Sequence, residues 1–131
     1  MPAPERREWR LSLNENAPRK ARGMISAAVA GRVGSGDLDN LLLLATELVA
    51  NAVKHGMPEF DGHIGLRLEI EPGTVRVVVT DGGPHFHRPT RDEEHGGSDA
   101  PRFGLFLVDA VAARWGVSVD GDKAVWFEVD F

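Results

Sequence analysis

The chain contains no cysteine, and this absence excludes several kinds of chemistry at the outset. Without thiols there is no disulfide bond, no thiolate nucleophile and no cysteine-ligated metal. The chain also lacks a run of about 18 apolar residues, the length that a membrane-spanning helix requires. The segment Met1–Arg7 lacks the apolar core of a signal peptide. We therefore expect a soluble cytoplasmic protein without a membrane partner.

An excess of positive charge is also missing. The formal net charge is -5 at pH 7, whereas a protein that binds nucleic acid needs a basic surface to neutralise phosphates. We expect no direct binding of nucleic acid, although local groups can still hold a small phosphate ligand. Hydrophobic residues make up 42% of the chain and charged residues 27%, as in an ordinary globular domain. We expect a single domain over residues 1–131, with residues 1–6 disordered.

A leucine-rich segment predicts a long helix. Between Leu38 and Val53 the apolar residues recur every three or four positions, which is the spacing of one helix face. The helix should begin near Asp37, a residue type suited to the N-cap, and should end at Gly56.

One side of this helix carries residues with useful chemistry. Glu47, Asn51 and His55 are spaced four apart, so they share that side. A carboxylate that can act as a base is thereby held beside an amide oxygen that can bind a metal ion. The same residues are equally compatible with a solvated helix face, and this segment alone does not decide between the two interpretations.

The remaining elements come in groups. We expect strands over residues 7–13, 64–70, 74–80, 117–119 and 125–131. We expect a second helix from a cap at Asn16 to Val29, and a third from Gly104 to Trp115 that stops at Gly116. Because hairpins are grouped rather than alternating with helices, the predicted class is α+β. The predicted architecture is a two-layer α/β sandwich, with a mixed, mostly antiparallel sheet and three helices on one face.

Two further segments have the composition of binding elements. Asp81-Gly82-Gly83 follows a strand, where a carboxylate can accept a hydrogen bond from an exocyclic amine and glycine lets a flat ligand approach. Gly104-Leu105 opens the third helix, where a glycine can present free N–H groups to phosphate. Each segment also has a structural interpretation without a ligand. The first can be a simple turn, and the second can be a well-packed helix start.

A long polar loop over residues 84–102 separates these two segments. A loop of this length in a small domain is usually functional. It carries His85, His87 and His95, whose spacing matches no metal-binding pattern, so we interpret them as polar loop residues. We interpret Trp115 and Trp126, which come later in the chain, as core residues.

Taken together, the three segments resemble the GHKL superfamily, which has the Bergerat ATP-binding fold and includes gyrase and the histidine kinases. The pattern is Glu-x-x-x-Asn on a helix, Asp-x-Gly after a hairpin, and Gly-Leu-x-Leu-Val at a helix start. Arg114–Val117 and Ala124–Glu128 are similar to the small stand-alone members, the anti-sigma-factor serine kinases of the RsbW and SpoIIAB type. The resemblance runs from about Trp9 to Phe131.

The resemblance implies a role for each residue on the leucine-rich helix. Glu47 matches the general base, which acts on a protein serine in the kinases and on water in the ATPases. Asn51 matches the asparagine that binds the magnesium ion bridging the nucleotide phosphates. Lys54 and His55 would add positive charge near those phosphates. The implied cofactors are ATP and Mg2+.

It also implies roles for the other two segments. Asp81 matches the residue that recognises the adenine amine, and Gly83 matches its close-packed neighbour. Gly104, followed by Leu105, matches the glycine under the phosphates. Residues 84–103 match the lid that closes on nucleotide.

Two positions depart from the family pattern. His85 stands where the Asp-x-Gly-x-Gly motif has its second glycine, and Arg102 stands where the Gly-x-Gly-Leu motif has its first. The Arg102 guanidinium would be suited to contact a phosphate oxygen, since its geometry matches that group.

The function implied by the resemblance is that of an ATP-binding regulatory protein. It would be an anti-sigma factor with serine/threonine protein kinase activity toward an anti-sigma-factor antagonist, so its partners would be a sigma factor and that antagonist. The two departures keep a second hypothesis open, a nucleotide-gated or nucleotide-free interaction module without kinase activity. A third is an ATPase that hydrolyses ATP without a protein substrate. The sequence also leaves the oligomeric state open, with a homodimer as one possibility.

Overall fold

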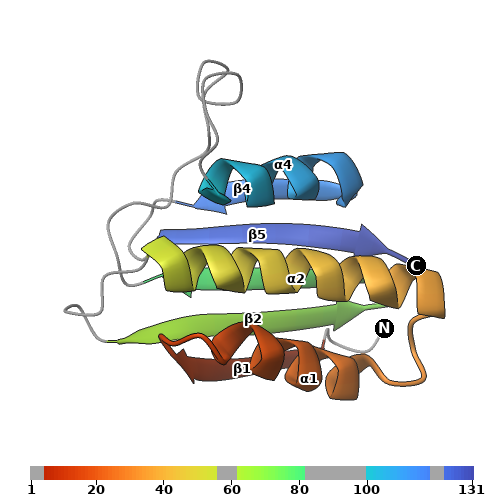
Figure 1. Cartoon of the computed structure of the whole chain (residues 1–131). Coiled ribbons are helices and arrows are strands. Elements are labelled where there is room, and N and C mark those ends of the chain that lie inside the picture. Colours follow the sequence, from red (N-terminus) through yellow and green to blue (C-terminus); the bar gives the residue numbers. More distant parts are fainter. Residues whose placement is uncertain (1–4, 56–61, 82–99, 119–122) are drawn as a thin grey trace.

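The structure, a computed structural model, describes residues 5–55, 62–81, 100–118 and 123–131 (Figure 1). The elements in chain order are β1 (Glu5–Ser12), α1 (Ala17–Val29), α2 (Ser35–His55), β2 (His63–Glu71), β3 (Thr74–Asp81), α4 (Ala100–Val111), β4 (Arg114–Ser118) and β5 (Lys123–Asp130). No helix in these ranges is both long and apolar enough to cross a membrane.

The five described strands form one sheet in the order β1-β2-β3-β5-β4. All four pairings between them are antiparallel. The three described helices lie side by side on one face of this sheet, with α2 between α1 and α4 (Figure 1). The predicted α+β fold with two layers is therefore confirmed.

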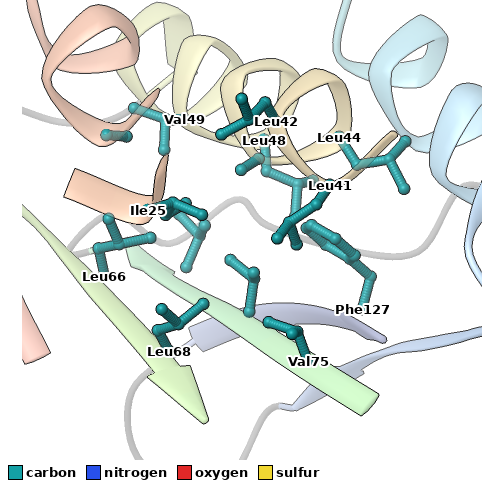
Figure 2. Close-up of a cluster of buried hydrophobic side chains, with 14 of the residues drawn as sticks. Ile25, Leu41, Leu42, Leu44, Leu48, Val49, Leu66, Leu68, Val75 and Phe127 are labelled. Atoms are coloured by element: carbon teal, nitrogen blue, oxygen red, sulfur yellow. The ribbon is translucent and has the colours of Figure 1, made fainter. Parts of the chain in front are cut away.

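Strand β2 shows why one sheet face became the core. Its residues alternate between buried apolar side chains, such as Ile64, Leu66 and Leu68, and exposed or half-buried ones, such as Arg67 and Glu69. Alternation places the buried set on one face, as expected for a sheet covered on one side only. Figure 2 shows Leu66 and Leu68 on the side of the sheet that faces the leucines of α2. The core therefore lies between the sheet and the helices.

The beginnings of three elements differ in detail from the predictions. β1 already begins at Glu5, so residues 5 and 6, predicted to be disordered, pair with Ile70 and Glu69 of β2. α2 begins at Ser35, and Asp37 lies in its first turn. α1 follows Asn16 as predicted, but the Asn16 side chain makes no capping hydrogen bond. Its Oδ1 atom instead accepts a hydrogen bond from Arg19 at 3.1 Å.

The third predicted helix differs at both ends. α4 begins at Ala100 rather than Gly104, and it ends at Val111 rather than continuing to Trp115. Trp115 instead lies in β4, opposite Phe127 of β5. The backbone hydrogen bonds that β4 makes with β5 are tertiary contacts, and such contacts override local helical spacing.

The two tryptophans of the C-terminal hairpin lie on opposite faces of the sheet. Trp115 packs against the core under the helices, as predicted. The prediction for Trp126 was wrong, because it lies on the face without helices, opposite Val78 and Gly116. There it is half-buried, and the Arg76 guanidinium lies 4.3 Å from the centroid of its ring.

The face without helices carries a row of alternating charges across all five strands. The row runs Arg6, Glu69, Arg76, Glu128 and Arg114, and each member pairs with the next in the strand register. The shortest ion pairs within it join Glu128 to Arg114 at 2.5 Å and to Arg76 at 3.1 Å. Cross-strand pairs of opposite charge stabilise neighbouring strands. This face is therefore covered in part by its own charged side chains.

Candidate functional site

The C-terminal half of α2 carries the residues predicted from the spacing of four. Glu47 and Asn51 lie within the helix, one turn apart and on the same side. Glu47 is half-buried, Lys54 is exposed, and His55 is the last residue of the helix. Asn51 is only 6% exposed. Among the residues whose burial is described, it is the one polar side chain buried in the interior.

A buried amide at position 51 calls for an explanation. Leu44 and Leu48 precede it at helical spacing on the same side of α2, and both are fully buried. Packing alone would favour a third apolar residue here, because burial of an amide has a cost in free energy that hydrogen bonds or a ligand must offset. Asn51 lies at the end of an apolar ridge and is therefore a candidate functional residue.

The neighbours of α2 show which element this side faces. α2 contacts α1 on one side and α4 on the other, and it packs on β2, β3 and β5. In Figure 2 the Leu44 side chain points toward α4, whereas Val49 lies on the side of α1. Asn51 comes seven residues after Leu44, so it also lies on the α4 side of α2.

The end of β3 lies at the same end of the sheet. Asp81 is the last residue of β3, and in the register it pairs with Ile64 and Lys123. Figure 1 shows that α2 ends and α4 begins above this end of the sheet. The fold thus places the backbone of Asp81 and the two helix ends at the same end of the domain. Gly83 lies outside the described residues.

The start of α4 corrects one expectation about the phosphate-binding glycine. The N–H groups at the first four positions of a helix lack an acceptor within it. In α4 these positions are residues 100–103, of which Pro101 has no N–H. Gly104 and Leu105 follow them, so the prediction that Gly104 opens the helix was wrong. Arg102 lies in the first turn. Of the predicted lid, residues 100–103 belong to α4, and residues 84–99 lie outside the described part of the chain, with His85, His87 and His95 among them.

The donor set on α2 suits a metal ion that arrives with a nucleotide. Within the described ranges, no group of three His, Asp or Glu side chains could hold a metal ion. Mg2+ in nucleotide sites usually takes one or two protein oxygens, with phosphate and water oxygens as its other ligands. One buried amide oxygen at Asn51, beside the Glu47 carboxylate, fits that pattern.

One contact near this site was not predicted from the sequence. The Trp115 Nε1 atom donates a hydrogen bond to Asp109 Oδ1 at 2.7 Å, and this bond connects α4 to β4. The two residues are six apart, which is not the spacing of neighbours on a helix. With Trp115 assigned to a helix, no signal in the sequence pointed to the pair.

Comparison with known proteins agrees with the fold and the residue pattern. The sequence profile of the histidine kinase-like ATPase domain family matches residues 11–128, and the chain belongs to this family. The predicted superfamily is thus confirmed, and with it the class of ATP-binding domains. A comparison with curated proteins found no match.

A solved structure shows the same fold. It is the histidine kinase domain of a blue-light activated histidine kinase from Erythrobacter litoralis, with a TM-score of 0.56 and 19% sequence identity. The match covers 92% of this chain but only 61% of that one. At this identity the likeness shows the fold alone, and the chain spans less than two thirds of the length of that domain.

Proposed function

We propose that this chain is an ATP-binding regulatory protein, an anti-sigma factor that phosphorylates a serine or threonine of an antagonist protein. The observation that carries the proposal is the position of Asn51. It is a buried amide, one turn after Glu47, on the side of α2 that faces α4. Such a pair in a histidine kinase-like ATPase domain suits phosphoryl transfer, which needs a positioned metal and neutralised charge.

The residues of α2 would have different roles in binding the phosphates of ATP. Bound ATP supplies the phosphoryl group. The Asn51 amide oxygen would hold the metal ion, since Mg2+ prefers oxygen ligands. Lys54 follows Asn51 by three positions and adds positive charge at the helix end. The resemblance adds further nucleotide-binding positions at His55, Asp81, Gly83, Arg102, Gly104 and Leu105.

Glu47 is the proposed general base. Its half-buried carboxylate would accept the proton of a partner's serine hydroxyl as the serine oxygen bonds to the γ-phosphorus of ATP. The bond from that phosphorus to the bridging oxygen breaks, and ADP leaves. The partner classes are a sigma factor and an anti-sigma-factor antagonist. They come from the similarity of Arg114–Val117 and Ala124–Glu128 to the stand-alone anti-sigma-factor kinases.

A second candidate function is an interaction module without kinase activity. It is favoured by the start of α4, because Gly104 follows the first four positions, where N–H groups lack an acceptor within the helix, and Pro101 among them has no N–H. Arg102 stands in that first turn where the family pattern has glycine. In this alternative the domain binds partner proteins, and nucleotide changes its affinity for them weakly or not at all.

Phosphate transfer to copurified partners distinguishes these functions. The protein is purified with its bound partners and incubated with Mg2+ and γ-labelled ATP. We expect label on a serine or threonine of a partner, and loss of the label with Glu47→Gln. Asp39→Asn, an exposed acid on the same helix, is the matched control. No transfer, with equal partner binding by Glu47→Gln, would favour the interaction module. Phosphate release that needs Glu47 but no partner would favour a hydrolytic ATPase.

A further inference from the structure

We infer that Asp109 is a positioning residue that fixes the orientation of α4 beside α2. Through α4 it sets the shape of the proposed nucleotide site, so this consequence rests on the proposed function. The inference itself comes from how the C-terminal end of α4 is held.

The C-terminal end of α4 is tied to the edge of the sheet. The Asp109 carboxylate accepts the hydrogen bond from Trp115 Nε1 at 2.7 Å. Just past the helix, the Ala113 N–H donates to the Glu128 carbonyl of β5 at 2.9 Å. Only residues 112 and 113 separate α4 from β4. One end of α4 is therefore anchored, and the site lies at the other end.

Apolar side chains hold α4 on the core between its ends, because half-buried Leu107 and Val111 pack against the core beside Val108. Among its residues whose burial is described, only Val108 is fully buried. Phe106 and Ala110 are exposed, whereas α2 buries a whole face that includes Leu44 and Leu48. Apolar contact has no preferred direction, so it does not by itself fix the angle of α4 about its own axis.

Asp109 is placed to prevent a rotation of α4 about this axis. It follows Val108 directly, so it lies about 100° around the helix from the buried ridge. A hydrogen bond at that angle acts off the axis of rotation and fixes the angle of the helix against β4. Trp115 is a stable anchor, because it packs against the core on the face under the helices.

The hydrogen bond at Asp109 affects the proposed site because α4 transmits a change of orientation along its length. Gly104 precedes Asp109 by five positions, which is about 7.5 Å along a helix axis. The helix transmits a rotation at Asp109 to its first two turns as a rigid body. Those turns lie across from the α4 side of α2, where Asn51 is buried. A loosened α4 would therefore change the separation between its start and Asn51.

A distance measurement across the two helices tests the placement directly. Because the native chain has no cysteine, Ala50→Cys on α2 and Ala110→Cys on α4 give a clean pair of spin-label sites, and both positions are exposed. We expect one narrow distance distribution in this parent. Asp109→Ala and Trp115→Phe should each broaden or shift it, since one removes the acceptor and the other removes the donor but keeps a ring. Asp109→Asn keeps an acceptor oxygen and should restore the narrow distribution.

Titration with ATP and Mg2+, using unlabelled proteins, tests the consequence for the site. Asp109→Ala should weaken binding roughly tenfold, the scale of one partly exposed hydrogen bond to a charged group. Asp109→Asn and the distant control Asp39→Ala should stay close to the parent.

Each outcome decides a separate point. Unchanged distances in both Asp109→Ala and Trp115→Phe would overturn the positioning role. Altered distances with unchanged ATP affinity would overturn its link to the site. If the parent binds no ATP, the proposed function fails, and the distance measurement still decides whether Asp109 positions α4.

Discussion

A Cβ atom added to Gly116 would lie 3.0 Å from three atoms of the Trp126 indole. The ring of Trp126 therefore covers the backbone of the edge strand β4, on the face that has no helices. Arg76 contacts the same ring, at 4.3 Å from its centroid. Glycine in a strand interior normally weakens the strand, and a close approach of this kind is a recognised reason for it.

Replacing Gly116 with alanine should destabilise the protein by about 1 kcal/mol, because the ring must move and gives up packing with Gly116 and Arg76. The free energy of unfolding in urea measures the effect. Gly23→Ala is the control, since a Cβ there meets nothing within 4 Å and glycine disfavours a helix interior. The control should stabilise the protein by up to about 1 kcal/mol. A Gly116→Ala protein as stable as the parent would contradict the contact.

Two adjacent leucines of α2 should differ sharply when shortened. Leu44 is fully buried between α2 and α4, whereas Leu43 is 40% exposed. Leu44→Ala should lower the free energy of unfolding by about 2–5 kcal/mol, since it leaves a cavity. Leu43→Ala should lower it by less than about 1 kcal/mol. Both changes replace leucine with alanine and have the same effect on helix propensity. Similar losses of the free energy of unfolding would therefore contradict the different burial of the two leucines.

The charged row on the open face predicts a dependence of stability on pH. Burial raises the pKa of Glu128, but hydrogen bonds from Arg114 and Arg76 outweigh it, so this pKa lies below its usual value. Hydrogen bonds from Arg114 and Thr74 likewise lower the pKa of Asp130. A carboxylate with a lowered pKa in the folded state contributes stability above its unfolded pKa, and this contribution is lost as the pH falls through the folded value.

Stability should therefore hold above about pH 5 and fall below about pH 4, where these carboxylates become protonated. The loss of stability can be measured as the change in the urea midpoint of unfolding between about pH 3 and pH 7. Glu128→Gln should be less stable than the parent near neutral pH and should lose less stability toward acid. Parallel pH profiles for the two proteins would mean that Glu128 contributes nothing through its charge.

Glu47→Gln should separate nucleotide binding from phosphate transfer. The amide keeps the shape of the side chain but cannot accept the proton, so transfer to a partner serine should fall by about 100-fold or more. The dissociation constant for ATP should change by less than about threefold, because Asn51 and not Glu47 is proposed to hold the metal. Single-turnover transfer and calorimetry provide the two readouts. A large loss of ATP affinity would instead assign Glu47 to binding.

The parts of the fold set by local periodicity could be predicted from the sequence. The leucine spacing of α2 and the alternation in β2 and β3 come directly from which face each residue buries. The pairing of Glu47 with Asn51 on one helix side depends only on helix geometry. The superfamily could be predicted in part because Glu47, Asn51 and Asp81 of its motifs lie on these same elements.

Features that depend on distant contacts could not be predicted in the same way. Trp115 fits a helical spacing after Val111, and only the pairing with β5 places it in a strand. Val125, Trp126 and Phe127 are apolar in succession, so alternation does not show that Trp126 points away from the core. The start of α4 was misjudged because Gly104 resembles a helix start, and the helical turn before it has no apolar periodicity.

Calorimetric titration with ATP and Mg2+ tests the central claim most directly, using the parent protein and two asparagine variants of α2. Asn51 is buried on the side that faces α4, and Asn40 is exposed on the same helix. We expect about micromolar binding by the parent and by Asn40→Ala, and an affinity at least about tenfold lower for Asn51→Ala, a loss of ~1.4 kcal/mol or more. Equal binding by Asn51→Ala, or no binding by the parent, would contradict the proposed site.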